Sequence, residues 1–196
     1  MKAYTLTLAL LTLALVAFTT TDSNAQQAFK SNGKSVITLN GTSTLHDWTM
    51  QAKSFTTNVQ MAVGANNSID GISGLTLVLP VVNLKSEKDG LNENAWETLE
   101  YEDHKNITYK LTTAKVTPAG GNKYQIAASG NLTIAGVTKP VSMNVTATAN
   151  ADGSFNCTGT LPIKLSQFNI ERPSFMFGTM SVGDAMTLSY NVHLVK

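Results

Sequence analysis

The stretch from residue 123 to residue 147, KYQIAASGNLTIAGVTKPVSMNVTA, constrains the fold more than any other part of the chain. Apolar and polar residues alternate on both sides of a turn at residues 135–140. That turn holds Gly136, which permits an unusual backbone angle, and Pro140, which opens the return strand. A period of two predicts a hairpin with one face in a core and the other in water. The inward residues would be Tyr124, Ile126, Ala128, Val141, Met143, Val145 and Ala147.

Shorter alternations continue through the rest of the chain. Residues 36–39 precede Asn40-Gly41, a strong signal for a two-residue hairpin turn, and residues 43–50 follow it. Further alternating segments lie at 55–61, 69–84, 107–111, 155–165 and 186–194. About nine strands at this spacing predict an all-β fold, an antiparallel sheet closed into a barrel or a sandwich.

The period changes between residues 86 and 103. Leu91, Ala95, Trp96 and Leu99 are spaced as one stripe of a helix. Ser86 or Asn92 would be its N-cap. We therefore expect one α-helix inserted between strands.

Residues 1–25 have the pattern of a targeting segment. Lys2 gives a positive start, residues 9–18 are an apolar run, and small residues precede an expected cleavage site after Ala25. The run is too short to span a bilayer, and these flanks disfavour the alternative of a buried N-terminal helix. We expect residues 26–196 to form a single exported domain, either periplasmic or secreted.

Composition and motifs argue against several classes of function. The formal net charge is +1 with no basic run between aromatics, so nothing indicates nucleic-acid binding. Cys157 is the one cysteine and is expected to be a small apolar strand residue. The histidines and this cysteine show no metal-ligand spacing. His46 and Asp47 are adjacent and would point to opposite faces of a strand, so they do not suit a catalytic triad. We expect neither an enzyme nor a cofactor.

Four segments together resemble the YceI-like family of secreted bacterial proteins. They are GTSTLHDW at 41–48, YEDHKNITY at 101–109, GNLTIAGVTKPV at 130–141 and SQFNI at 166–170. The chain departs from the family pattern at Asn106, where proline is common, at Tyr109, where phenylalanine is common, and at Gln167 and Asn169, which replace Asp and Gly. These departures affect turns more than the core.

The resemblance implies a lipocalin-like antiparallel barrel of about eight to nine strands with the helix beside its mouth. It also implies a long isoprenoid, quinone-like or other apolar lipid as ligand, held by a carrier, scavenger or buffer. The alternative is a barrel filled by its own side chains that acts as an envelope stress or protein-interaction module. Transient membrane contact and a homodimer stay open.

The candidate ligand-binding residues follow from these patterns. His46 and Trp48 are expected to face the bore, with His46 near a polar head, although a core tryptophan with a hydrogen-bonded histidine is an equal alternative. The helix stripe would form the mouth or lid. The loop at 171–178 would complete the mouth, touch a donor membrane or simply cover the core. The full set is His46, Trp48, Met50, Phe55, Leu91, Trp96, Leu99, Tyr109, Phe168, Phe175 and Phe177.

Overall fold

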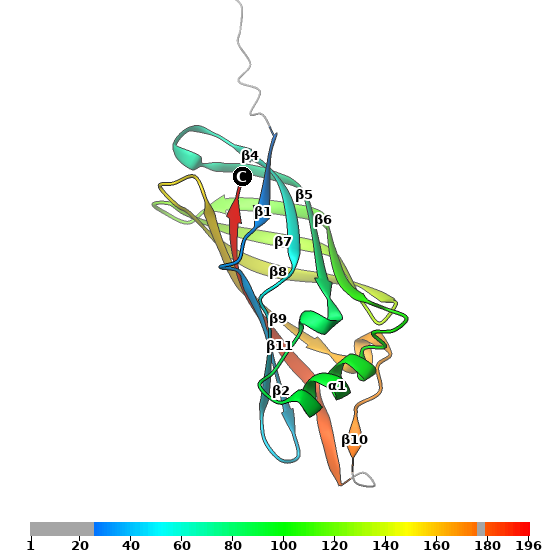
Figure 1. Cartoon of the computed structure of the whole chain (residues 1–196). Coiled ribbons are helices and arrows are strands. Elements are labelled where there is room, and N and C mark those ends of the chain that lie inside the picture. Colours follow the sequence, from blue (N-terminus) through cyan, green and yellow to red (C-terminus); the bar gives the residue numbers. More distant parts are fainter. Residues whose placement is uncertain (1–25, 176–178) are drawn as a thin grey trace, which may run out of the picture.

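The computed structural model describes residues 26–175 and 179–196 (Figure 1). The expected targeting segment and its cleavage site lie outside the described residues, as do Phe177 and the side chain of Phe175. Within the described ranges, no helix is long and apolar enough to cross a membrane.

The fold is a closed antiparallel barrel, which confirms the all-β prediction and selects the barrel over the sandwich. β11 closes the wall by pairing with β1 at Lys30–Val195 and Ser31–Leu194. The wall strands follow one another in the order β1 (Gln26–Ser31), β4 (Thr56–Val63), β5 (Ile69–Pro80), β6 (Asn106–Pro118), β7 (Lys123–Ile134), β8 (Val137–Ala149), β9 (Phe155–Lys164) and β11 (Met180–Val195).

The hairpin of β7 and β8 has the predicted inward face. Tyr124 pairs with Ala147, and both are buried. The turn is shorter than expected, because Ile134 already pairs with Val137 and only two residues with positive φ lie between them. Such two-residue turns match the twist of the strands they join. Pro140 therefore lies inside β8, on a part that has no β9 partner, since those two strands pair only from Val145 onward.

A second hairpin extends one end of the wall. β2 (Val36–Ser43) pairs with β11, and β3 (Trp48–Ala52) pairs with β2. The expected turn at Asn40-Gly41 is wrong, because both residues lie inside β2 and the chain reverses at residues 44–47. The short β10 (Ser174–Phe175) pairs with the start of β11 at the same end. Figure 1 shows this end opposite the start of β1.

One α-helix, α1 (Asp89–Thr98), lies beside the β2–β3 hairpin (Figure 1). It is shorter than the predicted segment, and neither predicted residue caps it, because Lys88 occupies the N-cap without a side-chain bond. Ser86 and Asn92 instead form a hydrogen bond with each other, in which the backbone N–H of Ser86 donates to Asn92 Oδ1 at 2.6 Å. Three 3-10 turns complete the structure: η1 (Ala65–Asn67), η2 (Val81–Asn83) and η3 (Leu165–Phe168).

The core changes character along the barrel axis. At the end near the start of β1, Phe29 and Phe155 are fully buried and meet edge to face, with ring centroids 5.2 Å apart. Toward α1, the core is formed mainly by aliphatic side chains, and Leu91 and Leu99 of the helix segment pack against it. The aromatic end is therefore closed by packing, and the helix end is the one to examine for access.

Candidate functional site

Three apolar cavities lie in series inside the barrel, and we call this series the bore. The barrel cavity has a volume of about 150 Å³, the middle cavity about 60 Å³ and the helix cavity, beneath α1, about 90 Å³. Ile107 and Leu132 line both the barrel and the middle cavities. Leu99 and Met186 line both the middle and the helix cavities. Because neighbouring cavities share wall residues, they lie next to one another in a series that runs from the barrel to the helix.

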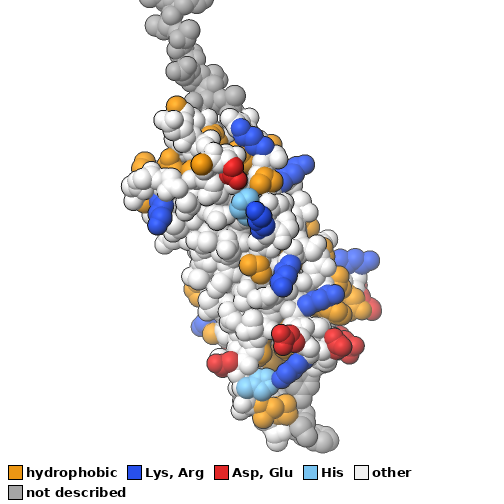
Figure 2. Space-filling model, turned by 60° about the vertical axis from the view of Figure 1, so that its left-hand side comes forward, with side chains coloured by type: hydrophobic (Ala, Val, Ile, Leu, Met, Phe, Trp, Pro, Cys, Tyr) orange, Lys and Arg blue, Asp and Glu red, His pale blue; other side chains and the backbone are white. Residues whose placement is uncertain are grey.

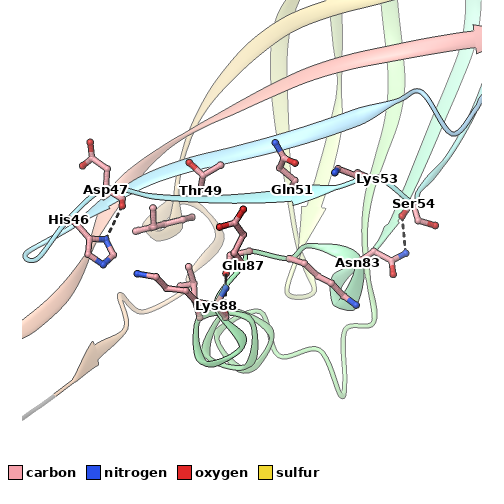
Figure 3. A pocket seen from close by; sticks show the side chains of 13 residues that line it. His46, Asp47, Thr49, Gln51, Lys53, Ser54, Asn83, Glu87 and Lys88 are labelled. Carbon is pink, nitrogen blue, oxygen red and sulfur yellow. Dashed lines mark hydrogen bonds between the residues drawn. The ribbon is translucent and has the colours of Figure 1, made fainter.

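A larger hollow lies outside this route, between β3 and the segment that leads into α1, and we call it the outer groove (Figure 3). Its volume is about 670 Å³. Backbone bonds between Gln51 and Lys85, at 2.7 and 2.9 Å, hold the two sides together at one point. This is an isolated bridge, so beyond it the free edge of β3 and residues 86–88 stand apart. The groove is the gap that results.

Uncharged polar side chains and charged side chains of both signs line the outer groove. Figure 3 shows Lys53 and Lys88 at its rim together with Asp47 and Glu87. The face drawn in Figure 2 likewise carries lysines and carboxylates interspersed rather than a continuous basic stripe. Such a surface suits the polar part of an amphipathic ligand and leaves the apolar part to the bore.

Trp48 and Leu91 form the boundary between the outer groove and the bore. Both residues line the groove and the helix cavity alike. Trp48 is half-buried and is held in place because its indole N–H donates to the Thr42 carbonyl at 3.0 Å. Its ring lies over Gly41, where any added methyl group would overlap with it. The boundary therefore has one fixed ring from β3 and one aliphatic side chain from α1.

Several predicted site residues do line the bore. Met50 and Leu99 line the helix cavity, Phe168 lines the middle cavity and Tyr109 lines the barrel cavity. Met50, Phe168 and Tyr109 are buried. The structure thus places these four along one route, and with Trp48 and Leu91 they extend it to the surface.

Other predicted site residues lie outside the bore. His46 is exposed, with Nδ1 at 2.8 Å from the Asp47 carbonyl oxygen, and it lines the outer groove instead of the bore. The inward alternation fails because β3 begins only at Trp48. Trp96 lines neither the groove nor the bore, since its indole N–H donates to the Leu84 carbonyl at 2.9 Å and its ring faces Tyr101. Phe55 packs against the core from the connection between β3 and β4.

Sequence reasoning missed a pairing of inward glycines with aromatic rings. Tyr109 lies over Gly130 and Tyr190 over Gly159, in the same way as Trp48 over Gly41. A ring covers each glycine because the missing side chain leaves room against the wall. The available signal was a glycine inside a strand pattern, which marks close approach of another group. The consequence is a wall of flat rings that leaves space along the barrel axis.

The titratable groups that line the barrel cavity, Tyr109, Cys157 and Tyr190, have raised pKa values. Burial raises the pKa of the Cys157 thiol to about 12 and contributes most to a similar rise for Tyr190. Burial also raises the pKa of Tyr109. Cys157 lines the barrel cavity, which agrees with its predicted role as a small apolar residue. Among the described residues, no group of His, Cys, Asp and Glu is arranged to hold a metal ion.

Several solved structures resemble this one. BcnA of Burkholderia cenocepacia is 21% identical, with a TM-score of 0.64 over 82% of this chain and 96% of that chain. A polyisoprenoid-binding domain from Saccharophagus degradans, implicated in plant cell wall breakdown, is 12% identical, with a TM-score of 0.66 over 87% of this chain and 98% of that chain. The YceI protein of Campylobacter jejuni is 16% identical, with a TM-score of 0.54 over 100% and 99%. These likenesses establish a shared barrel fold.

Sequence comparison leads to a family. No curated protein matches the chain. The model of the YceI-like domain, however, matches residues 20–194. That range includes the helix and all the strands described above except Val195, the last residue of β11, and the chain therefore belongs to the YceI-like domain family.

Proposed function

We propose that this chain is an exported, non-enzymatic protein that holds a long apolar lipid of the isoprenoid type as a carrier, scavenger or buffer. The observation that carries the proposal is the bore, a series of apolar cavities that ends at Trp48 and Leu91, the two residues it shares with the outer groove. An apolar chain gains about 25 cal/mol for each Å² removed from water, so such a route favours a slender hydrocarbon. The solved polyisoprenoid-binding domain of the same fold supports this ligand class.

The ligand's polar end is expected to stay in the outer groove. Among the described residues, no lysine or arginine lines the barrel or helix cavities, and Lys164, which lines the middle cavity, is exposed; Lys53, Lys85 and Lys88 line the groove. Burying a charge in an apolar cavity is very unfavourable. The proposed arrangement therefore has the tail in the bore and any charged head outside Trp48.

The size of the cavities favours a second candidate function. Each of the three is well below the roughly 300–1,000 Å³ of a typical ligand site. A long ligand must therefore widen the bore, and the methionines in its walls, Met50, Met143 and Met186, are adaptable enough to move. If they do not move, the barrel is a filled module whose outer groove contacts a protein partner.

Native mass spectrometry separates these two functions. The full chain would be produced with its own N-terminal segment, purified from the envelope or medium, and extracted with solvent. A polyprenyl or quinone species in stoichiometric amount is the result expected for a lipid carrier. A clean apo mass, together with no uptake of an added polyprenol, would refute the carrier and leave the filled barrel.

A further inference from the structure

Two buried hydroxyl groups in the bore have no hydrogen-bond partner within the described structure. They are Oγ1 of Thr57 and the phenol oxygen of Tyr109. Thr57 is 3% exposed and Tyr109 is 7% exposed, and both residues line the barrel cavity. Unpaired buried hydroxyls are uncommon and destabilise a fold. Valine and phenylalanine would occupy the same space without that penalty, so the two hydroxyls need an explanation.

The sheet register places the Cα atoms of Thr57 and Tyr109 on one level of the barrel. Thr57 of β4 pairs with Leu77 of β5, and Leu77 pairs with Tyr109 of β6. Directly paired residues share a face of the sheet, and adjacent strands lie about 4.8 Å apart. The Cα atoms of Thr57 and Tyr109 are therefore about 10 Å apart across the strands, on either side of Leu77. The Tyr109 phenol oxygen lies over Gly130 of β7, on the side away from Thr57, so the two hydroxyls offer separate contacts to a ligand in the cavity.

The surroundings decide which chemistry these hydroxyls suit. Aliphatic side chains dominate the barrel cavity, and none of the described residues that line it is charged. Burial keeps the Tyr109 phenol protonated, because it raises the pKa of that group above its ordinary value of 10.0. Tyr109 is therefore a hydrogen-bond donor at neutral pH, and an uncharged acceptor is the partner that such a cavity tolerates.

We infer that the bore selects isoprenoids that carry an uncharged oxygen, a carbonyl or an ether, which accepts a hydrogen bond from Tyr109 or Thr57 inside the barrel. This inference rests on the proposed lipid-carrier function and adds a polar contact within the apolar route. A pure hydrocarbon leaves both hydroxyls unpaired, whereas an oxygenated chain satisfies at least one of them. Selectivity then depends on functional groups as well as on chain length.

Two matched probes and three variants test the inference. The probes are farnesylacetone, an isoprenoid methyl ketone, and the hydrocarbon in which its carbonyl is a methylene group. The variants are Tyr109→Phe, Thr57→Val and, as control, Tyr124→Phe, which changes a buried tyrosine that lines none of the three cavities. Affinities for both probes are measured by native mass spectrometry, and folding by circular dichroism. The first two variants should be at least as stable as the wild type, because each removes an unpaired hydroxyl.

The readout is the ratio of ketone affinity to hydrocarbon affinity. The ratio should fall about fivefold to tenfold in Tyr109→Phe or Thr57→Val, with hydrocarbon affinity unchanged, and should be unaffected in Tyr124→Phe. An unchanged ratio in both variants would overturn the inference and leave water as the partner of these hydroxyls. If the wild type binds neither probe, the carrier function itself fails and the inference fails with it.

Discussion

Filling the barrel cavity with a fixed side chain is expected to exclude the ligand without unfolding the protein. Ala128 of β7 is buried and lines this cavity, whereas the next residue along the strand, Ala127, is exposed on the outer face. A dry cavity of about 150 Å³ accommodates one benzene ring. The cavity here has that volume, so the phenyl group of Ala128→Phe occupies the space a lipid would need.

The expected stability follows from the cavity volume. At about 24 cal/mol per Å³ of cavity, complete filling of about 150 Å³ would add on the order of 3–4 kcal/mol to the free energy of unfolding. Imperfect fit opposes this by about 1–3 kcal/mol. The net gain should be about 1–2 kcal/mol, which raises the Tm by about 2–8 °C for a domain of this size.

Thermal unfolding by circular dichroism and uptake of a polyprenol by native mass spectrometry measure the two effects. Ala128→Phe should lose uptake and keep or raise its Tm. Ala127→Phe should retain uptake, with a stability change within about 0.5 kcal/mol. Stoichiometric uptake by Ala128→Phe at unchanged affinity would refute the claim that the ligand occupies the barrel cavity. Unfolding of that variant would refute the claim that the cavity has room for a ring.

Three further perturbations have defined outcomes. Trp48→Asp should reduce polyprenol uptake at least tenfold at an unchanged circular dichroism spectrum, while Thr158→Asp on the exposed outer face of β9, at a residue that lines neither the groove nor the bore, leaves uptake intact; equal loss of folding would make Trp48 a core residue only. Gly41→Ala should lower the free energy of unfolding, measured in urea, by about 1–3 kcal/mol, because the added methyl group overlaps with the Trp48 ring. Gly33→Ala is the control and should leave this free energy unchanged, because a methyl group there meets no other atom. Asp184 accepts two hydrogen bonds of 2.8 Å from the η3 turn, and these bonds hold its pKa below the ordinary value of 3.8. The ionised carboxylate therefore stabilises the folded state above about pH 4, and this contribution is lost as the pH falls through the lowered pKa. The Tm difference between wild type and Asp184→Asn should shrink over that acid range, and a pH-independent difference would contradict this role.

The barrel could be predicted from the sequence because its strands follow simple local rules. The alternation around Tyr124 and Val145 identifies the inward face without knowledge of the partners. The turn signal at Asn40-Gly41 was misleading because the conformation there depends on a contact with another strand. Gly41 is inside a strand because a distant ring, that of Trp48, covers it, and no local rule contains that contact.

The site could be predicted where a regular strand or helix pattern continued, as it does at Leu91 and Leu99 of the helix segment. Met50 and Tyr109 lie inside the bore as expected, since both are within regular strands. The prediction that His46 faces the bore is wrong, because His46 precedes β3 and does not take part in its alternation. The outer groove could not be predicted, because it arises where β3 and the segment after Lys85 separate in space. The unpaired hydroxyls of the barrel cavity could not be predicted either, because the hydrogen-bond partners of a side chain depend on its neighbours in three dimensions.

The position of β11 between strands on both of its sides has a consequence for how the fold is assembled. This strand pairs with β9 on one side, and on the other with β2 toward the helix end and with β1 beyond it. These three partners, and β10, which pairs with the start of β11, all precede it in the sequence. Contacts between such distant segments form slowly, and here the closing of the wall and the anchoring of the β2–β3 hairpin depend on the same late strand. A chain that lacks β11 has neither an enclosed interior nor a fixed opening, so the capacity to hold a lipid arises only in the final stage of folding.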